Sequence, residues 1–409
     1  MKPAVGLVLS GGGARGAYEV GILSGLIEAT AALANEARFE IVAGTSVGAI
    51  NGSWIAANAD ERSYRIAGLE QLWSSLSLAD HMRVDLRGLL GWLNPLRALH
   101  TPDDFALGDH FTRSILKPET FEALVRDSID WDKLHHNIEH GLVRALMIAA
   151  LHIGTGATTL FAELSNHVNQ QQLIHPGRVT RFERIEADHV LASSAIPILL
   201  PARRIGSSYF VDGGLRFNTP ISPAIRAGAQ KLVIVSLHHE TAAVLKANGD
   251  GVTELYPSPT FLAGKLLNTL LSDPITNDVE VLKRINELMR ALNMTLTVEQ
   301  REKLDQTMIE RHGSAPRNIE TLIFEPSQNI GLLAGAHLRN SKGGWNIGQM
   351  YERFLARAAH DAATWESDLA SYLLFDGEWA QTLISLGRKD ALARRGEIAA
   401  FFTSPQSTP

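Results

Sequence analysis

Short apolar runs that end in glycine-rich turns alternate with helical patterns at the start of the chain. Ala4–Leu9 and Phe39–Ala43 are apolar enough to be buried strands, and each leads into a turn rich in glycine. The residues after each turn are compatible with a helix, and the first such helix has an apolar face of Val20, Leu23, Leu26, Ile27 and Leu33. Two strand–helix units in succession predict an α/β fold, a parallel sheet with crossover helices.

Further strands are predicted in the middle of the chain. Leu146–Ile153 and Thr158–Phe161 flank a Gly-Thr-Gly turn, which indicates a hairpin. Tyr209–Val211 is a short extended run, and Lys231–Leu237 is rich in β-branched residues. We expect one late strand at Thr321–Phe324.

Beyond about residue 240 the pattern is mainly helical. We therefore divide the chain into residues 1–330, whose motifs lie within 4–240, and a helical C-terminal part, 331–409. The helices expected along the whole chain are Ser63–Leu76, Phe121–Ile129, Ile185–Ala195, Phe261–Leu271, Ile275–Leu292, Val298–Arg311, Gly343–Ala363, Trp365–Phe375 and Trp379–Phe402.

The composition is that of a globular protein and excludes several classes of site. The 409 residues carry a net charge of −6 that is not gathered in blocks, so no nucleic-acid partner is expected. The absence of cysteine excludes disulfides and thiolate chemistry, and it fits a reducing compartment. The first apolar run is short, and no run reaches the roughly 18 residues of a membrane span. We expect a first strand rather than a signal peptide, and a cytoplasmic protein whose closest approach to lipid is peripheral contact with a membrane.

The most informative stretch is Glu40–Asn51, which reads E-I-V-A-G-T-S-V-G-A-I-N. It places G-x-S-x-G between a predicted strand and a predicted helix, the arrangement of a nucleophile elbow. A serine hydroxyl is a weak nucleophile, and a sharp turn exposes it to a base. Gly44 and Gly48 permit the tight bend. Ser46 is therefore the candidate nucleophile, and a glycine-rich turn without chemistry is the alternative.

The loop after the first strand, Ser10–Gly16, has two interpretations. Gly11, Gly13 and Gly16 match the G-x-G-x-x-G spacing of dinucleotide-binding proteins. Those proteins carry an acidic residue at the end of the second strand, where this chain has Gly44–Ser46. An oxyanion hole fits better, because glycines let backbone N–H groups turn toward a negatively charged oxygen.

Two arrangements could supply a base to Ser46. Asp212 ends an apolar strand, where partial burial would raise its affinity for the proton, although Asp-Gly is also a common turn pair. His238 or His239 lies beyond a later strand and would complete a Ser–His–Asp triad. A metal site at His238–Glu240 is not expected, because consecutive residues of a strand point to opposite faces. The residues alone leave the dyad and the triad open.

Four segments together resemble the patatin-like phospholipase family. The resemblance covers roughly residues 4–240 and leaves the C-terminal helical part without a recognised motif. In chain order the segments are similar to the family's oxyanion loop at Gly11–Gly16, its nucleophile motif at Gly44–Gly48, its internal helix-end motif at Ala192–Pro197 and its D-G-G/A motif at Asp212–Gly214 with Asn218 and Pro220 beyond.

The resemblance implies a three-layer α/β/α fold with a mostly parallel central sheet. It implies a serine esterase that hydrolyses lipid acyl esters without a metal or nucleotide cofactor, with Ser46 as nucleophile and Asp212 as base. A catalytically silent lipid-binding protein on the same fold is the alternative. The implied oxyanion hole is Gly11, Gly12, Gly13 and Ala14, and the supporting motif positions are Arg15, Gly16, Gly44, Gly48, Gly213 and Gly214.

Two features concern the lipid partner. Arg15 resembles the family's loop cation, and we interpret it as holding the loop or attracting a phosphate headgroup, with a plain surface arginine as the alternative. Met82–Leu99 mixes leucine and tryptophan with arginine, which suits either a lid that touches lipid or an ordinary packing excursion. Headgroup and chain-length preference, the need for an activator and the oligomeric state are not indicated by the sequence.

Overall fold

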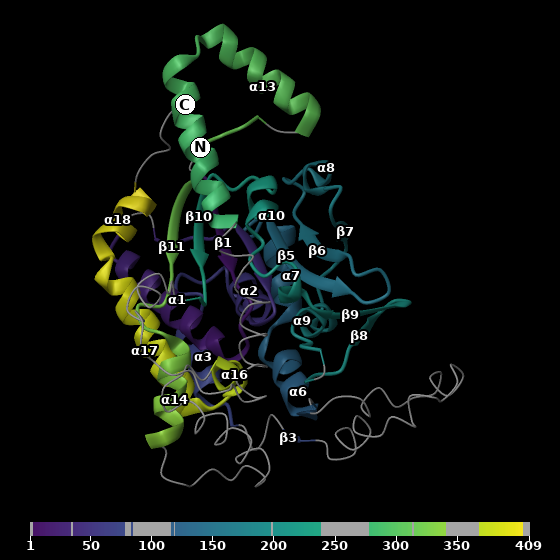
Figure 1. Ribbon diagram of the computed structural model, residues 1–409, viewed down its shortest axis with the longest axis vertical. Helices are drawn as coiled ribbons and strands as arrows, with labels where there is room; N and C mark the ends of the chain where they lie inside the picture. The colour runs from purple at the N-terminus through teal and green to yellow at the C-terminus, as the bar shows by residue number, and fades with distance from the viewer. Residues whose placement is uncertain are drawn as a thin grey trace, which may run out of the picture.

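A mostly parallel sheet forms the centre of the protein (Figure 1). The computed structural model describes residues 3–33, 36–77, 83–84, 116–117, 119–197, 199–238, 278–312, 315–340 and 368–403. Within them, nine strands form one sheet, and its main path runs, from edge to edge, β11 (Glu320–Phe324), β10 (Lys231–Val235), β1 (Val5–Leu9), β2 (Ile41–Thr45), β5 (Ala145–His152), β6 (Thr158–Leu164) and β7 (Val179–Phe182).

The sheet is parallel from β11 to β5 and changes character beyond it. The pairs from β11 to β5 are all parallel, whereas β5 and β6 form the predicted antiparallel hairpin. Two more strands, β8 (Arg203–Ile205) and β9 (Ser208–Asp212), attach at the end of β5, with β9 antiparallel to it. The predicted late strand is confirmed as β11 at one edge.

The two faces of the sheet bury two separate apolar layers. Along β1, Leu7 and Leu9 belong to the larger hydrophobic cluster, and Val8 between them belongs to the smaller one. This alternation follows from the pleat of a strand, which sends successive side chains to opposite faces. A sheet covered by helices on both faces is a three-layer α/β/α architecture, so the predicted fold class is confirmed.

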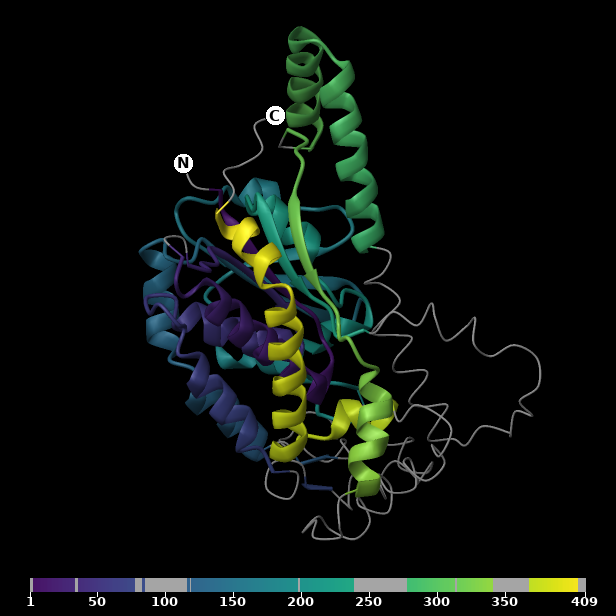
Figure 2. The same cartoon turned by 90° about the vertical axis from the view of Figure 1, so that its left-hand side faces the viewer.

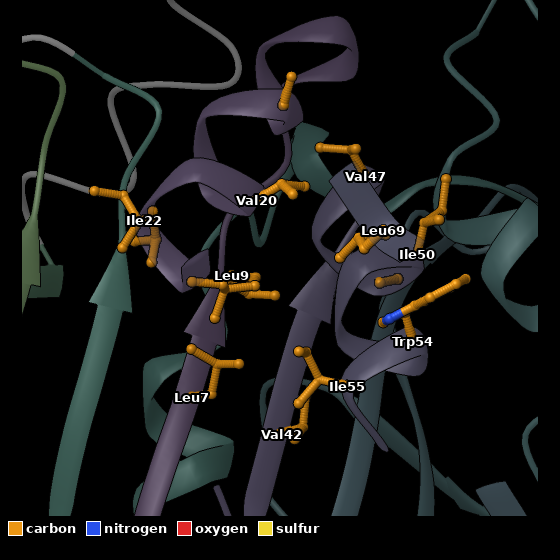
Figure 3. Packing of buried hydrophobic residues seen from close by; sticks show 14 of the residues in the cluster. Leu7, Leu9, Val20, Ile22, Val42, Val47, Ile50, Trp54, Ile55 and Leu69 are labelled. Atoms are coloured by element: carbon orange, nitrogen blue, oxygen red, sulfur yellow. The ribbon is translucent and has the colours of Figure 1, made fainter. Parts of the chain in front are cut away.

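Helices cover the larger apolar face of the sheet. Figure 3 shows Leu9 on β1 and Val20, Val47 and Trp54 on the helices of this face. The helices of this face are α1 (Ala17–Thr30), α2 (Val47–Ala57), α3 (Ile66–Ser74), α6 (Glu119–Ser128), α7 (Trp131–Glu139), α9 (Ala187–Ser193), α14 (Ile330–Asn340), α16 (Asp368–Leu373), α17 (Gly377–Ala393) and α18 (Arg395–Thr403).

The smaller face is covered by α8 (Gln170–Leu173), α10 (Ile221–Arg226) and a helix over residues 278–295. That helix and α13 (Val298–His312) form a helical hairpin that projects beyond the sheet (Figure 2). The hairpin precedes β11, so it joins the sheet at the amino end of that strand. The loops after β1 and β2 lie at the opposite, carboxyl edge.

Several predicted elements need adjustment. Among the elements that we did not predict are the helices α7, α8, α10 and α14 and the strand β7. The helix predicted over Trp379–Phe402 is two helices, because the chain leaves helical geometry at Arg394. The predicted helices Phe261–Leu271 and Gly343–Ala363 and nearly all of the Met82–Leu99 segment lie outside the described residues.

The helix α17 packs against α1 with glycine at the closest contacts. A Cβ added at Gly21 of α1 would lie 2.2 Å from the Ile384 carbonyl oxygen, and one at Gly387 of α17 would lie 2.3 Å from the Tyr18 carbonyl oxygen. Trp379 is fully buried in the same cluster as the strands of the sheet. The division at residue 330 stays a prediction, but the described C-terminal helices share the main core with the motif-bearing part.

Gly21→Ala tests this contact. We expect it to lower the free energy of unfolding by about 1–3 kcal/mol, because the added methyl group pushes two backbones apart. The matched control is Gly396→Ala in α18, where an added Cβ meets no atom within 4 Å; it should be neutral or stabilising by about 0.5 kcal/mol. Urea unfolding measures both, and equal stability of the two variants would contradict the proposed close packing.

Candidate active site

One edge of β5 brings Ser46 and Asp212 together. The strand β2 pairs with β5 as far as Thr45 opposite Ala149, and β9 takes over that edge with Asp212 opposite Ala150. The two strands therefore meet end to end, with Ser46 just past the end of β2. At this junction the Ser46 hydroxyl donates a hydrogen bond to Asp212 Oδ2 over 2.6 Å.

The backbone turns sharply at Ser46, immediately before α2. Its φ of 55° and ψ of −124° are unusual for a residue with a side chain, and such strain costs about 1–3 kcal/mol. Both motif glycines permit close backbone contacts around the turn. A Cβ at Gly44 would lie 2.3 Å from the Gly48 carbonyl oxygen, and one at Gly48 would lie 2.5 Å from that of Leu9. The turn therefore has the geometry of a nucleophile elbow.

Ser193, at the end of α9, connects the elbow to β5 by two hydrogen bonds, which we call the brace of the elbow. Its hydroxyl oxygen accepts from the Ser46 amide over 2.8 Å, and its O–H donates to the Ala149 carbonyl over 2.6 Å. Two residues on, the Ala195 carbonyl accepts from the Asp212 amide over 2.9 Å. The segment Ala192–Pro197, known from the sequence only as a motif, thus contacts both residues of the pair.

The Asp212 carboxyl is buried and has two hydrogen-bond donors. Oδ2 accepts from Ser46, and Oδ1 accepts from the Gly214 amide over 2.7 Å. Burial outweighs both hydrogen bonds and raises the pKa of Asp212 to about 7. Gly213 lies so close to β5 that a Cβ there would be 2.3 Å from the Ala149 carbonyl oxygen. An aspartate with this pKa is suited to exchange a proton near neutral pH.

The glycine-rich loop runs beside the elbow and has amides without acceptors. A short 3₁₀ helix begins at Gly13, and among the described residues the amides of Gly12, Gly13 and Ala14 donate to no acceptor. The amide of Gly11 differs, because it donates to the Asn218 carbonyl over 3.3 Å. Gly13 has a φ of 55°, which favours glycine. Three amides are therefore available to a negatively charged oxygen.

An asparagine of α2 connects the loop to the elbow helix. Asn51 donates to the Gly16 carbonyl over 3.1 Å and to Glu19 Oε2 over 2.9 Å, and its own side-chain oxygen accepts from Trp73 Nε1 over 3.0 Å. Glu19 is fully buried, which raises its pKa well above the usual range. Sequence reasoning missed Asn51, although a polar residue inside an otherwise small and apolar helix is a signal for it.

An apolar pocket opens beside the Ser46 hydroxyl. Its walls come from the glycine-rich loop at Gly13, the elbow with α2, α6, the segment after α9 and the segment around the end of α16. The apolar lining residues are Val47, Ile50, Phe121, Ile196, Leu199, Leu200, Leu373 and Phe375. Apolar side chains of this kind are typical of a pocket for a hydrocarbon chain, and Ser46 is among the lining residues.

A sequence model described as patatin-like phospholipase matches residues 7–225, more than half of the chain. The chain belongs to the patatin-like phospholipase family. The resemblance predicted from the four motifs is thus confirmed, and a lipid hydrolase function follows at the level of the family. No curated protein sequence matches the chain.

Solved structures of other proteins are similar to the chain at low identity. VipD from Legionella pneumophila has 15% identity and a TM-score of 0.30 over 93% of this chain and 92% of that one. Human GIVD cytosolic phospholipase A2, in complex with methyl gamma-linolenyl fluorophosphonate, has 13% identity and a TM-score of 0.42 over 98% and 59%. ExoU in the ExoU–SpcU complex of Pseudomonas aeruginosa has 16% identity and a TM-score of 0.30 over 96% and 75%.

The remaining predicted residues have clear positions. Arg15 is buried, so the interpretation as a surface arginine is wrong. His238 is half-buried beyond β10, whose strand is separated from β2 by β1. His239 and Glu240 lie outside the described residues. In the described part of this patatin-like chain, no group of His, Asp and Glu side chains could hold a metal ion, and no helix could cross a membrane.

Ser193→Ala tests the brace of the elbow. We expect a loss of about 1–3 kcal/mol in the free energy of unfolding, because the buried Ser46 amide loses its acceptor. Ester hydrolysis should fall with it as the elbow relaxes. The matched control is Ser165→Ala, which removes the hydroxyl of a buried serine that accepts from the His167 amide over 3.4 Å and does not line the pocket. Thermal unfolding and kcat measure both variants, and equal behaviour of the two would refute the brace.

Proposed function

We propose that this protein is a lipid acyl hydrolase that cleaves carboxylic esters with Ser46 as nucleophile and Asp212 as general base. The observation that carries the proposal is the 2.6 Å hydrogen bond from the Ser46 hydroxyl to a buried carboxyl whose pKa burial raises to about 7. The serine lines an apolar pocket, and the family is that of the patatin-like phospholipases.

The first half of the reaction forms an acyl-enzyme. Asp212 accepts the hydroxyl proton as Ser46 Oγ attacks the ester carbonyl, and the C=O electron pair moves to the oxygen. The tetrahedral intermediate collapses, the C–O bond to the alcohol breaks, and the proton passes from Asp212 to the leaving oxygen. Deacylation repeats the sequence with water, which Asp212 deprotonates, and returns Ser46 as the free alcohol.

The glycine-rich loop is the proposed oxyanion hole. A negatively charged oxygen beside Ser46 is stabilised by amides that need no reorganisation, and each such donor typically contributes about 10²–10³ in rate. Gly12, Gly13 and Ala14 are the best donors of the four predicted positions, because their amides have no acceptor among the described residues. The Gly11 amide already donates to Asn218, so its contribution would be to hold the loop.

The direct serine–aspartate contact favours the dyad over the triad. In a triad the imidazole lies between the serine and the acid. Here the hydroxyl donates to the carboxylate itself. Asp212 is the last residue of β9, which pairs with β5, whereas His238 lies beyond β10, two strands away from β2. The proposed reaction therefore uses no imidazole, metal or nucleotide. A lipid at a membrane surface is the proposed substrate, reached by peripheral contact.

Three variants test the dyad. Ser46→Ala should reduce hydrolysis of p-nitrophenyl esters and phospholipids by about 10⁴-fold or more, and Asp212→Asn by about 10²–10⁴-fold. His238→Ala, the control, should retain wild-type activity. Labelling by a fluorophosphonate should require Ser46. A folded His238→Ala protein without activity would return the triad, and a fully active Ser46→Ala protein would refute the proposed function.

The pH dependence of kcat/KM follows from the same pKa. The base must be deprotonated to accept the serine proton, so kcat/KM should fall about tenfold per pH unit below about 7 and level off above it. The measurement uses a soluble short-chain ester across pH 5 to 9, with thermal unfolding at each pH as the control for stability. A flat profile from pH 5 upward would contradict Asp212 as the titrating base.

A further inference from the structure

The arginine of the glycine-rich loop is buried against the C-terminal part of the chain. Arg15 is 3% exposed, and its Nε donates to Ser371 Oγ over 2.8 Å. Its Nη1 donates to Tyr372 Oη over 3.2 Å, and its guanidinium carbon lies 3.9 Å from the centre of the Tyr372 ring. A buried cation is costly unless it is hydrogen-bonded, so these contacts fix where Arg15 can lie.

The same tyrosine contacts the loop a second time, through its backbone. A Cβ added at Gly13 would lie 2.4 Å from the Tyr372 carbonyl oxygen. Gly13 and Arg15 flank Ala14, and the free amides of Gly13 and Ala14 lie within this short stretch. Contacts on both sides of Ala14 leave these amides little freedom to change direction.

The residues that follow in the chain form part of the pocket wall. Leu373 and Phe375 both line the pocket beside Ser46. The Phe375 ring packs on Trp73, with centroids 6.4 Å apart and planes 19° apart, and on Phe121 at 5.8 Å. Trp73 is the residue that donates to Asn51 of the elbow helix. The segment is therefore anchored to the body of the protein at several points.

We propose that the segment 371–375 completes the catalytic site, although it lies outside the residues matched by the family. Ser371 and Tyr372 are positioning residues that hold the glycine-rich loop in its active shape through Arg15. Leu373 and Phe375 set the depth of the acyl pocket and thereby the preferred chain length. This inference rests on the proposed hydrolase function and deepens it.

We call the contacts of Arg15 with Ser371 and Tyr372 the clamp. The proposed clamp predicts an effect on turnover rather than on substrate binding. Misaligned oxyanion donors weaken stabilisation of the transition state, while the ground-state ester binds mainly through its acyl chain. Loss of the two hydroxyl groups should therefore lower kcat and leave KM nearly unchanged. A lysine at position 15 keeps the charge but loses the planar, two-sided contact with Ser371 and Tyr372.

The test of the clamp is the double variant Ser371→Ala/Tyr372→Phe in the full chain, beside Arg15→Lys. We expect kcat for a short p-nitrophenyl ester to fall about tenfold to a hundredfold in each, with KM within about twofold. Adding Arg15→Lys to the double variant should cost little more, because the three groups act as one unit. The control is Tyr64→Phe, which removes a buried hydroxyl that accepts from the Phe39 amide and should lower stability alone.

A kcat within twofold of wild type in the folded double variant would overturn the clamp. The proposed function is judged separately, from the dependence of wild-type hydrolysis on Ser46. If wild type is active, Ser46→Ala is inactive and the double variant is unaffected, only the clamp fails. If the Ser46→Ala variant hydrolyses the ester as fast as wild type, the proposed function itself is refuted.

Chain-length preference tests the pocket wall independently. Phe375→Ala should shift the optimum of kcat/KM in a series of p-nitrophenyl esters toward longer acyl chains, because it lengthens the pocket. The matched control is Phe401→Ala, which removes an equally buried phenyl ring in α18 that does not line the pocket. It should lower stability with the same chain-length optimum as wild type. An unchanged optimum in Phe375→Ala would refute the role of this wall.

Discussion

The sharing of one edge of β5 by two strands is the constraint on which the site depends. The last residue of β2, Thr45, pairs with Ala149 of β5, and the last residue of β9, Asp212, pairs with the next residue, Ala150. The chain must therefore turn away from β5 directly after each of them, at Ser46 and at Gly213. Backbones crowd at this junction, which explains why a Cβ at Gly44 or Gly213 would strike a carbonyl oxygen. The strained serine and the carboxyl are held together by the hydrogen bonds of the sheet rather than by flexible loops.

Burial gives the site its chemistry as well as its rigidity. A carboxylate in water would keep its proton affinity low, whereas burial brings the pKa of Asp212 to about 7. The buried cation Arg15 is stabilised by direct contacts instead. It donates hydrogen bonds to Ser371 and Tyr372 of α16, and its guanidinium group lies over the Tyr372 ring. In the proposed reaction, the apolar surroundings of Ser46 would also strengthen the electrostatic interactions at the ester.

Local patterns in the sequence predicted many strands and helices and the motif residues. The contacts that could not be predicted depend on pairing between residues far apart in the chain. Strand and turn signals near Gly44 and Asp212 are local, so both residues stood out in the sequence. The register that places Asp212 beside Ser46 depends on pairing across 166 positions, and the partners of Arg15 lie more than 350 positions away. The helix α7 was not predicted because most of its residues are polar. Its start is marked by Asp130, whose side chain caps the helix by accepting from the Lys133 amide. No local pattern specifies Ser193 or Tyr372 as supports, whereas Asn51 differs locally from the small and apolar residues of α2.

The contact between α1 and α17 has a consequence for how the chain can be divided. Gly21 and Gly387 bring the backbones of the two helices together, and Trp379 of α17 is buried in the core that α1 shares with the sheet. A chain cut before α16 would expose this face of the core and would remove Ser371 and Tyr372, which accept hydrogen bonds from Arg15. We therefore expect that the residues matched by the family do not fold stably by themselves.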